Sequence, residues 1–226
     1  MGIHEDAGTI IAAALKAAQP DLAVTKALAG FAPNPEGRLV LVAVGKAAWQ
    51  MARAAGEVLG NRISNGIVIT KHGHLKGTLP GFILREGGHP LPDMDGVLAT
   101  REALAMVEGL EARDQVLLLI SGGGSALFED PLIPLAELAD ISGQLLRSGA
   151  DIREINTLRK RLSRVKGGRF ALRCAPARLR CLVLSDVLGD PLDSIASGPA
   201  VPDMSTSLEA LDIAGKRGLR LSEHAR

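Results

Sequence analysis

A run of glycines flanked by serines is the segment of this sequence best suited to binding an anion. The residues that directly follow the hydrophobic stretch Val116–Ile120 are Ser121, Gly122, Gly123, Gly124 and Ser125. Successive glycines allow a tight turn whose backbone N–H groups can face an anion, and the serine hydroxyls add further donors. The chemistry expected here is the binding of a phosphate or a carboxylate. The alternative is a flexible turn between a strand and a helix.

A lysine follows a second hydrophobic stretch, where a helix is expected to begin. Gly45 and Lys46 come directly after Leu39–Val44. The N-terminus of a helix carries partial positive charge, so a lysine there is unfavourable unless it meets an anion. The sequence therefore predicts that Lys46 neutralises a bound anion, the alternative being a solvated side chain.

This glycine–lysine segment does not match either of two familiar nucleotide-binding loops. Val40 stands where the P-loop pattern has its first glycine, and Ala47 stands where that pattern has Ser or Thr. The dinucleotide fingerprint also requires an acid at the end of the second strand, where Thr70 and Lys71 stand. The sequence therefore disfavours the binding of a nicotinamide dinucleotide.

Carboxylates gather after a third hydrophobic stretch. Asp186, Asp190 and Asp193 follow Cys181–Ser185 in a segment that also contains Gly189 and Pro191. Mg²⁺ in proteins is commonly held by one or two carboxylates together with substrate phosphates. An anion cradle, a lysine and metal-binding acids are the parts that phosphoryl transfer needs. The alternative for the acidic segment alone is a solvated loop.

Two further residues are candidates for ligand contact. His89 lies in a loop stiffened by Pro90 and Pro92, which could direct its side chain toward the same site. Lys166 precedes two glycines that are expected to end a helix and to bring the backbone close to a ligand. A structural role is the alternative for both. The other basic side chains of the helix predicted over Asp151–Lys166 are expected to form a solvated face.

These candidates follow short hydrophobic segments that alternate with amphipathic ones. The predicted strands are Leu39–Val44, Gly66–Thr70, Phe82–Arg85, Val116–Ile120 and Cys181–Ser185. The predicted helices are Ala7–Ala18, Lys46–Val58, Asp95–Glu108, Pro134–Arg147, Asp151–Lys166 and Ser205–Lys216. Continuous rather than alternating hydrophobic strands are typical of parallel sheets covered on both faces. The sequence therefore predicts an α/β fold, a Rossmann-like doubly wound and mostly parallel sheet whose ligands bind at the carboxyl ends of the strands.

Composition excludes several classes of function. The chain of 226 residues has a net charge of +1 and only 2% aromatic residues, which disfavours binding to nucleic acid. Its hydrophobic runs are far shorter than the ~20 residues that cross a bilayer. Cys174 and Cys181 have no partners for a zinc site. We expect a soluble cytoplasmic protein without nucleic-acid or membrane partners, and the sequence is compatible with a homodimer.

Several motifs together resemble the glycerate 2-kinases that carry a C-terminal MOFRL domain. The segments that match in order are Val44–Ala47, Gly88–Asp93, Ser121–Ala126, Leu162–Gly168, Ser185–Asp190 and Ala196–Pro199. The resemblance implies an enzyme that uses ATP and Mg²⁺ to phosphorylate the 2-hydroxyl of D-glycerate. It also implies that Lys46 neutralises the transferred phosphoryl group, that the Ser121–Ser125 loop holds phosphates or the glycerate carboxylate, and that Asp186 and Asp190 hold the metal or orient the hydroxyl.

The end of the sequence suggests that a domain is missing. Leu219–Leu221 is expected to form a strand. Ser222 followed by Glu223 resembles the N-cap of a helix, but the sequence ends before a helix could follow. We therefore expect residues 1–226 to be the N-terminal Rossmann-like domain of a glycerate kinase whose MOFRL domain is absent, with weak or no catalysis alone. The competing hypotheses are a hydroxypyruvate reductase and a module that binds a small metabolite without turnover.

Overall fold

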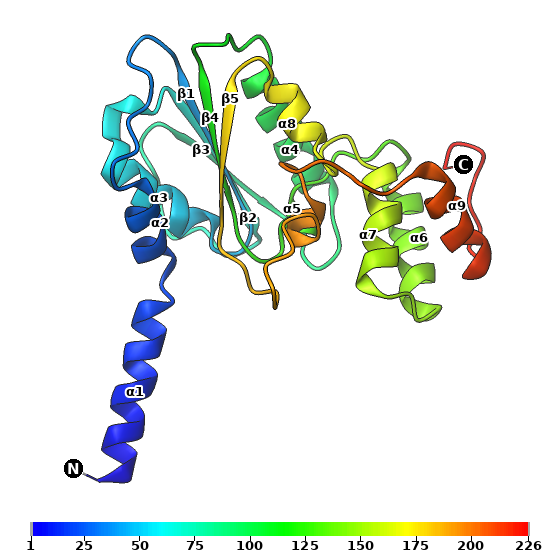
Figure 1. Ribbon diagram of the computed structural model, residues 1–226, viewed down its shortest axis with the longest axis horizontal. Helices are drawn as coiled ribbons and strands as arrows, with labels where there is room; N and C mark the ends of the chain where they lie inside the picture. The colour runs from blue at the N-terminus through cyan, green and yellow to red at the C-terminus, as the bar shows by residue number, and fades with distance from the viewer. Residues whose placement is uncertain (1, 226) are drawn as a thin grey trace.

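The computed structural model describes residues 2–225, which form a parallel five-stranded sheet with helices around it (Figure 1). The strands are β1 (Leu39–Val44), β2 (Asn65–Lys71), β3 (Phe82–Gly87), β4 (Gln115–Ile120) and β5 (Arg178–Val183). They lie in the order β3-β2-β1-β4-β5, and every neighbouring pair is parallel. The predicted α/β fold with a parallel sheet is confirmed.

The helices cover both faces of the sheet because side chains of each central strand point alternately to opposite sides. On one face, Leu39, Leu41 and Ala43 pack against α2 (Pro20–Leu28) and α3 (Ala48–Leu59). On the other face, Val40 and Val42 pack against α4 (Met94–Val107) and α8 (Arg169–Cys174). Both cores are almost wholly aliphatic, which explains why the central strands read as unbroken hydrophobic runs.

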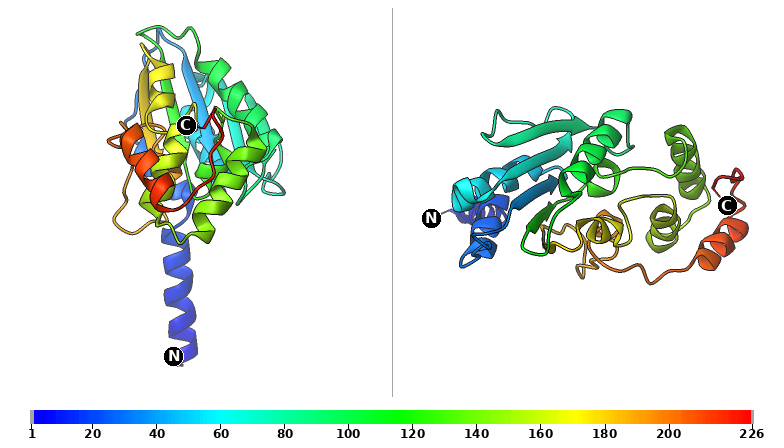
Figure 2. Two further views of the ribbon diagram at one scale, coloured as in Figure 1. Left: turned by 90° about the vertical axis from the view of Figure 1, so that its right-hand side faces the viewer. Right: turned by 90° about the horizontal axis from the view of Figure 1, so that it is seen from above.

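A smaller helical unit lies beside the sheet (Figure 2). It consists of α6 (Leu135–Arg147), α7 (Ile152–Arg161) and α9 (Ser207–Lys216). These helices share a separate core whose buried members include Leu138, Ile141, Leu145, Ile155, Leu158 and Ala214. The described residues 2–225 thus contain a Rossmann-like sheet and an adjacent helical unit.

The structure corrects several predicted boundaries. The helix predicted over Asp151–Lys166 ends at Arg161, because the backbone beyond it bonds to another segment: Leu132 N donates to Leu162 O and Arg164 N to Asp130 O. β5 begins earlier than predicted because an edge strand with exposed Arg178 is not continuously hydrophobic. Three short helices were not predicted from the sequence: α2, α5 (Gly124–Leu127) and α8.

The predicted strand at Leu219–Leu221 is not formed. Arg220 instead exchanges hydrogen bonds with the side chain of Gln144 on α6, so the segment pairs with an amide side chain and not with a sheet. At the other end, α1 (Ile3–Ala17) extends away from the body with no buried residue (Figure 1). Within residues 2–225, none of the helices combines the length and apolarity that crossing a bilayer requires.

Asp114, at the start of β4, predicts a pH-dependent contribution to stability. Its buried carboxylate accepts hydrogen bonds from the backbone of Glu111 and from Arg38, which lower its pKa from 3.8 to about 2. Because the folded-state pKa is depressed, this stability is present above the ordinary pKa and is lost as pH falls through about 2. We expect Asp114→Asn to lower the free energy of unfolding at pH 7 by about 2 kcal/mol, measured by urea denaturation. The difference from the wild type should shrink steadily in titrations below pH 4; a constant difference would contradict this account.

Candidate functional site

The glycine-rich loop and the loop that carries Lys46 lie side by side at the topological switch point of the sheet, between β1 and β4. β1 and β4 are adjacent, but their following connections lead to opposite sides, and ligands of open parallel sheets bind at such a point. Lys46 N donates to Gly122 O at 2.9 Å, and Ala47 N donates to Ser121 Oγ at 3.0 Å. Gly45 has a φ of +117°, and a Cβ there would collide with Ser121. Gly45 and Ser121 therefore lock the two loops together, and of these two residues Ser121 also lines the cavity described below.

Three of the predicted side chains converge on the backbone of the glycine loop. A Cβ on Gly122 would collide with the Asp186 carboxylate and would lie 3.3 Å from Lys46 Cε. A Cβ on Gly123 would lie 2.9 Å from His89 Cδ2. The glycines are thus required by the close approach of a cation, an acid and an imidazole.

The turn also leaves backbone donors free. Gly123 has a φ of +91°, which brings the chain into the short helix α5 (Gly124–Leu127). Among residues 2–225, the N–H groups of Gly122 and Gly123 have no hydrogen-bond partner, although both residues are only half-exposed. Free backbone donors beside a lysine suit an anion.

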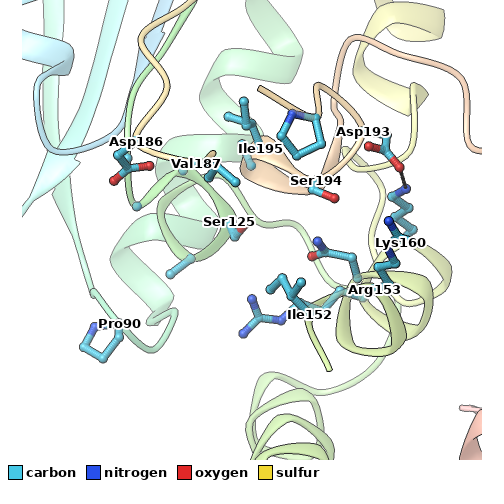
Figure 3. A pocket seen from close by; sticks show the side chains of 18 of the residues that line it. Pro90, Ser125, Ile152, Arg153, Lys160, Asp186, Val187, Asp193, Ser194 and Ile195 are labelled. Carbon is cyan, nitrogen blue, oxygen red and sulfur yellow. Dashed lines mark ion pairs between the residues drawn. The ribbon is translucent and has the colours of Figure 1, made fainter. Parts of the chain in front are cut away.

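A cavity of about 810 Å³ opens over this loop (Figure 3). Its lining includes His89, the whole Ser121–Ser125 loop and Asp186. Ser125 Oγ lies 3.2 Å from Oγ of the buried Ser197, which follows Ala196 of the cavity lining. Lys46 borders a smaller adjoining hollow that also contains Trp49 and His74, so its side chain stands between the two spaces.

Gly45, Asp190 and Lys166 are not brought to this cavity, and Lys46 approaches the glycine loop without lining the cavity itself. Asp190 is exposed on the loop after β5 and lies outside the cavity lining. Lys166 is completely buried, where its Nζ lies 2.9 Å from Glu129 Oε2 and donates to Phe128 O at 2.8 Å. The glycines after Lys166 pack against Val201 and Asp203, so they permit chain packing and not ligand approach. Lys166 is a structural residue inside the fold.

Sequence reasoning missed one wall of the cavity, the polar face of α7. Arg153, Asn156, Arg159 and Lys160 line it, whereas Ile155 and Leu158 face the helical core. Lys160 was expected to be solvated, but it is 5% exposed and lies between Asp193 and Asp203, at 3.7 and 3.6 Å. The helical spacing of these polar residues, opposite the apolar stripe, was the available signal.

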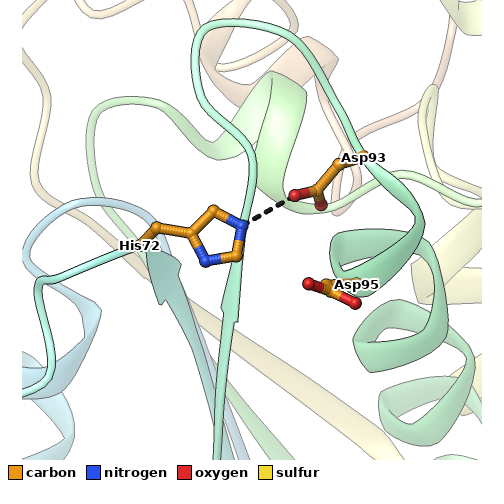
Figure 4. Close-up of side chains that lie close together, drawn as sticks. All are labelled: His72, Asp93 and Asp95. Atoms are coloured by element: carbon orange, nitrogen blue, oxygen red, sulfur yellow. Dashed lines mark hydrogen bonds and ion pairs between the residues drawn. The ribbon is translucent and has the colours of Figure 1, made fainter.

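A histidine–aspartate pair holds the loop that carries His89 (Figure 4). His72 Nε2 lies 2.7 Å from Asp93 Oδ2, and Asp93 Oδ1 accepts a hydrogen bond from Gly96 N at the start of α4. The pKa of His72 is raised because the Asp93 carboxylate favours its protonated form. Asp95 brings a third ligand atom within 4.8 Å of the other two. The pair ties the end of β2 to α4 and thereby brackets the His89 loop.

The electrostatics of His89 lead to a prediction. Its pKa is lowered from 6.5, first by burial and then by the charges of Lys46, Lys71 and His74, so the ring is neutral at pH 7. We expect an NMR titration of the ring protons to give a pKa below 6.5, and Lys46→Met to raise it part of the way back. Lys76→Met is the control, because the charge of Lys76 is not among those that lower the pKa of His89. An unchanged pKa in Lys46→Met would show that the two side chains do not interact.

The family comparison agrees with this geometry. Residues 6–226 match the family described as a domain of unknown function, DUF4147. The chain is 52% identical over 216 residues to a D-glycerate 2-kinase from Thermotoga maritima, covering 95% of this chain and 51% of that protein. It is 41% identical to a glycerate 2-kinase from Pyrococcus horikoshii, covering 93% and 49%.

A solved structure gives the same result. The crystal structure of glycerate kinase from Thermotoga maritima superposes with a TM-score of 0.92 at 51% sequence identity, covering 96% of this chain and 52% of that one. The chain spans about half the length of the curated relatives it matches. The resemblance predicted from the motifs is confirmed, and the chain belongs to the DUF4147 family together with the glycerate kinases.

Proposed function

We propose that this chain forms the phosphoryl-transfer site of a glycerate 2-kinase, which transfers the γ-phosphoryl group of ATP to the 2-hydroxyl of D-glycerate. The observation that carries the proposal is the convergence of Lys46, His89 and Asp186 on the free N–H groups of the glycine loop. The names of the relatives from Thermotoga maritima and Pyrococcus horikoshii support the choice of glycerate as acceptor.

Each group has a distinct role in this reaction. The bond between the γ-phosphorus and the oxygen that bridges to the β-phosphate breaks as a bond from the γ-phosphorus to the glycerate 2-oxygen forms. The hydroxyl proton passes to the neutral ring of His89, and ADP is the leaving group. Lys46 and the N–H groups of Gly122 and Gly123 stabilise the negative charge on the transferred group, because they are fixed before the reaction begins. Neutral His89 is able to accept a hydrogen bond from the attacking hydroxyl.

The donor set of the site fits Mg²⁺. Asp186 presents an exposed carboxylate to the cavity directly beside the glycine loop, and Mg²⁺ needs only one or two carboxylates when phosphates supply other ligands. Asp186 would hold the ion, which would neutralise charge on the nucleotide phosphates. Asp190 has a weaker claim to this role because it does not line the cavity.

A reductase is the less favoured function, although a protein of Agrobacterium vitis that is 41% identical carries a hydroxypyruvate reductase name. A nicotinamide dinucleotide is usually anchored by an acid at the end of the second strand. Here β2 ends at Thr70 and Lys71, and the Thr70 hydroxyl donates to Gly45 O at 3.0 Å. The residues at this position favour the kinase.

A product assay tests the proposal. The protein is incubated with ATP, Mg²⁺ and D-glycerate, and the phosphoglycerate formed is identified by NMR. We propose in addition that a second domain completes the site, since the relatives are about twice as long. The assay is therefore run on residues 1–226 and on a protein extended beyond Arg226. Formation of 2-phosphoglycerate by either supports the kinase; no product from both, with NADH oxidised by hydroxypyruvate, would refute it.

A further inference from the structure

We infer that Asn156 and Arg159 of α7 form a separate subsite for the carboxylate of the acceptor, on the wall of the cavity that faces the glycine loop. This inference rests on the proposed function, because it assigns the acceptor's carboxylate to a place. It goes further by separating the two anions of the reaction. The phosphate lies with Lys46 and the glycine loop, and the acceptor's acid group lies with α7.

Asn156 provides a buried donor that has nothing to bind within the described chain. Its side chain lines the cavity and is 3% exposed. Its Oδ1 accepts a hydrogen bond from Ser197 Oγ at 2.9 Å, which fixes the orientation of the amide. Its Nδ2 has no hydrogen-bond partner among residues 2–225. A buried N–H group without a partner is costly, so this donor is expected to meet an acceptor in the bound state.

Arg159 adds a positive charge without an ion-pair partner about one helical turn further along. Within residues 2–225 its guanidinium forms no ion pair and no hydrogen bond, although it is half-buried and lines the same cavity. Lys160 and Arg161 on the same helix are both paired with Asp203. Arg159 is therefore the half-buried cation of α7 that is left available to a ligand.

The buried ion pair behind α7 keeps this charge available. Glu129 is the acid whose charge acts on Arg159, but its Oε2 is already bound to Lys166 at 2.9 Å. Because Lys166 is paired with one oxygen of Glu129, this carboxylate compensates the charge of Arg159 only in part, and Glu129 Oε1 has no hydrogen-bond partner among residues 2–225. Burial lowers the pKa of Arg159, and an anion at its guanidinium would offset that effect.

The backbone around Ser197 holds the subsite in place. Ala196, Ser197 and Gly198 have consecutive positive φ values of 51°, 59° and 66°. Two non-glycine residues in this conformation are unfavourable, and such strain concentrates at functional sites. The arrangement lets Ser197 contact both Asn156 and Ser125, at 2.9 and 3.2 Å, and so connects α7 to the glycine loop.

The donors suit a carboxylate. A guanidinium offers two parallel N–H groups to the two oxygens of a planar carboxylate, and an amide N–H adds a third bond. Figure 3 shows Ser125 between the Asp186 side of the cavity and the wall that carries Arg153 and Lys160. An acceptor bound by its carboxylate at α7 would direct its 2-hydroxyl toward the glycine loop.

Ligand-binding measurements on Arg159→Met test the inference. D-glycerate, glycolate, glycerol and Mg·ATP are titrated by ligand-observed NMR, with Arg147→Met, an exposed arginine on α6, as the matched control. We expect Arg159→Met to weaken binding of the two carboxylates by about ten-fold or more and to leave Mg·ATP within about two-fold. Glycerol, which has no carboxylate, should bind equally poorly to all variants. Asn156→Asp, which keeps the acceptor for Ser197 and replaces the free donor with a charged oxygen, should weaken the same ligands.

The outcomes separate this inference from the proposed function. Weaker Mg·ATP binding with unchanged glycerate binding would assign α7 to a nucleotide phosphate and overturn the inference, while the kinase would stand. Unchanged binding of all ligands would also overturn it. If the wild type binds glycolate but not glycerate, and Arg159→Met weakens the binding of glycolate, the subsite would be supported and glycerate would be disfavoured as the substrate. No binding of any carboxylate by the wild type would overturn the subsite, whereas the kinase is tested by the product assay on the extended protein.

Discussion

Replacing Lys46 with methionine should lower kcat/KM for phosphoryl transfer by about a thousand-fold. The side chain reaches the glycine loop, where its Cε would lie 3.3 Å from a Cβ on Gly122. Charge that develops on a transferred phosphoryl group close to this position would lose its principal cationic partner. The effect should fall mainly on kcat, because the lysine is expected to interact more strongly with the transition state than with ATP.

The variant should retain the wild-type fold. The hydrogen bond that locks the two loops involves the backbone N–H of Lys46, and methionine preserves it. Among residues 2–225 the Lys46 side chain forms no ion pair, so its removal leaves no protein charge unpaired. Steady-state kinetics on the active form of the protein, with thermal unfolding as a check, measure the effect. Lys76→Met, in the adjoining hollow, is the control and should leave kcat nearly unchanged. A loss of less than about ten-fold in Lys46→Met would show that this lysine does not stabilise the transition state.

Gly122→Ala is the second variant expected to have a large effect, a loss of about a hundred-fold in kcat/KM. The added Cβ would collide with the Asp186 carboxylate and press on Lys46. Both side chains would be displaced from the loop, and the N–H donors of the turn would be partly covered. A displacement of the charged groups by as little as 1 Å has consequences of this size.

This substitution tests whether the Asp186 and Lys46 side chains must approach the loop backbone closely, and it does not introduce backbone strain. Gly122 does not have a positive φ, so alanine is compatible with its conformation, in contrast to Gly123 at +91°. Gly215→Ala, in α9 where a Cβ would meet nothing within 4 Å, is the matched control and should leave activity unchanged. Kinetics together with 31P NMR of bound ATP would follow the effect. Wild-type activity in Gly122→Ala would mean that phosphoryl transfer does not depend on the positions of the Asp186 and Lys46 side chains above the loop.

The strand pattern and the main features of the site could be predicted from the sequence because both depend on local order. Unbroken aliphatic runs alternating with helical segments specify a parallel sheet covered on both faces. The carboxyl ends of parallel strands meet at one edge, so residues that follow β1, β3, β4 and β5 are close by construction. Lys46, His89, Gly122 and Asp186 were found in this way, and the structure brings them together.

The remaining residues were decided by tertiary packing. Lys166 and Asp190 have local signals like those of Lys46 and Asp186, a lysine next to glycine and an acid after a strand. Lys166 is enclosed by a segment distant in sequence, because Glu129 and Phe128 bind its Nζ, whereas Asp190 is exposed on the loop after β5 and lies outside the cavity lining. Local sequence does not show which side chain or carbonyl from a distant segment will pair with a given charged residue.

The sequence by itself therefore determined the fold class, the family and the residues at the carboxyl edge of the sheet. Only the tertiary structure decided that α7 turns Asn156 and Arg159 into the cavity. An amphipathic helix shows which face is polar, but whether that face meets water or a ligand depends on where the helical unit packs beside the sheet.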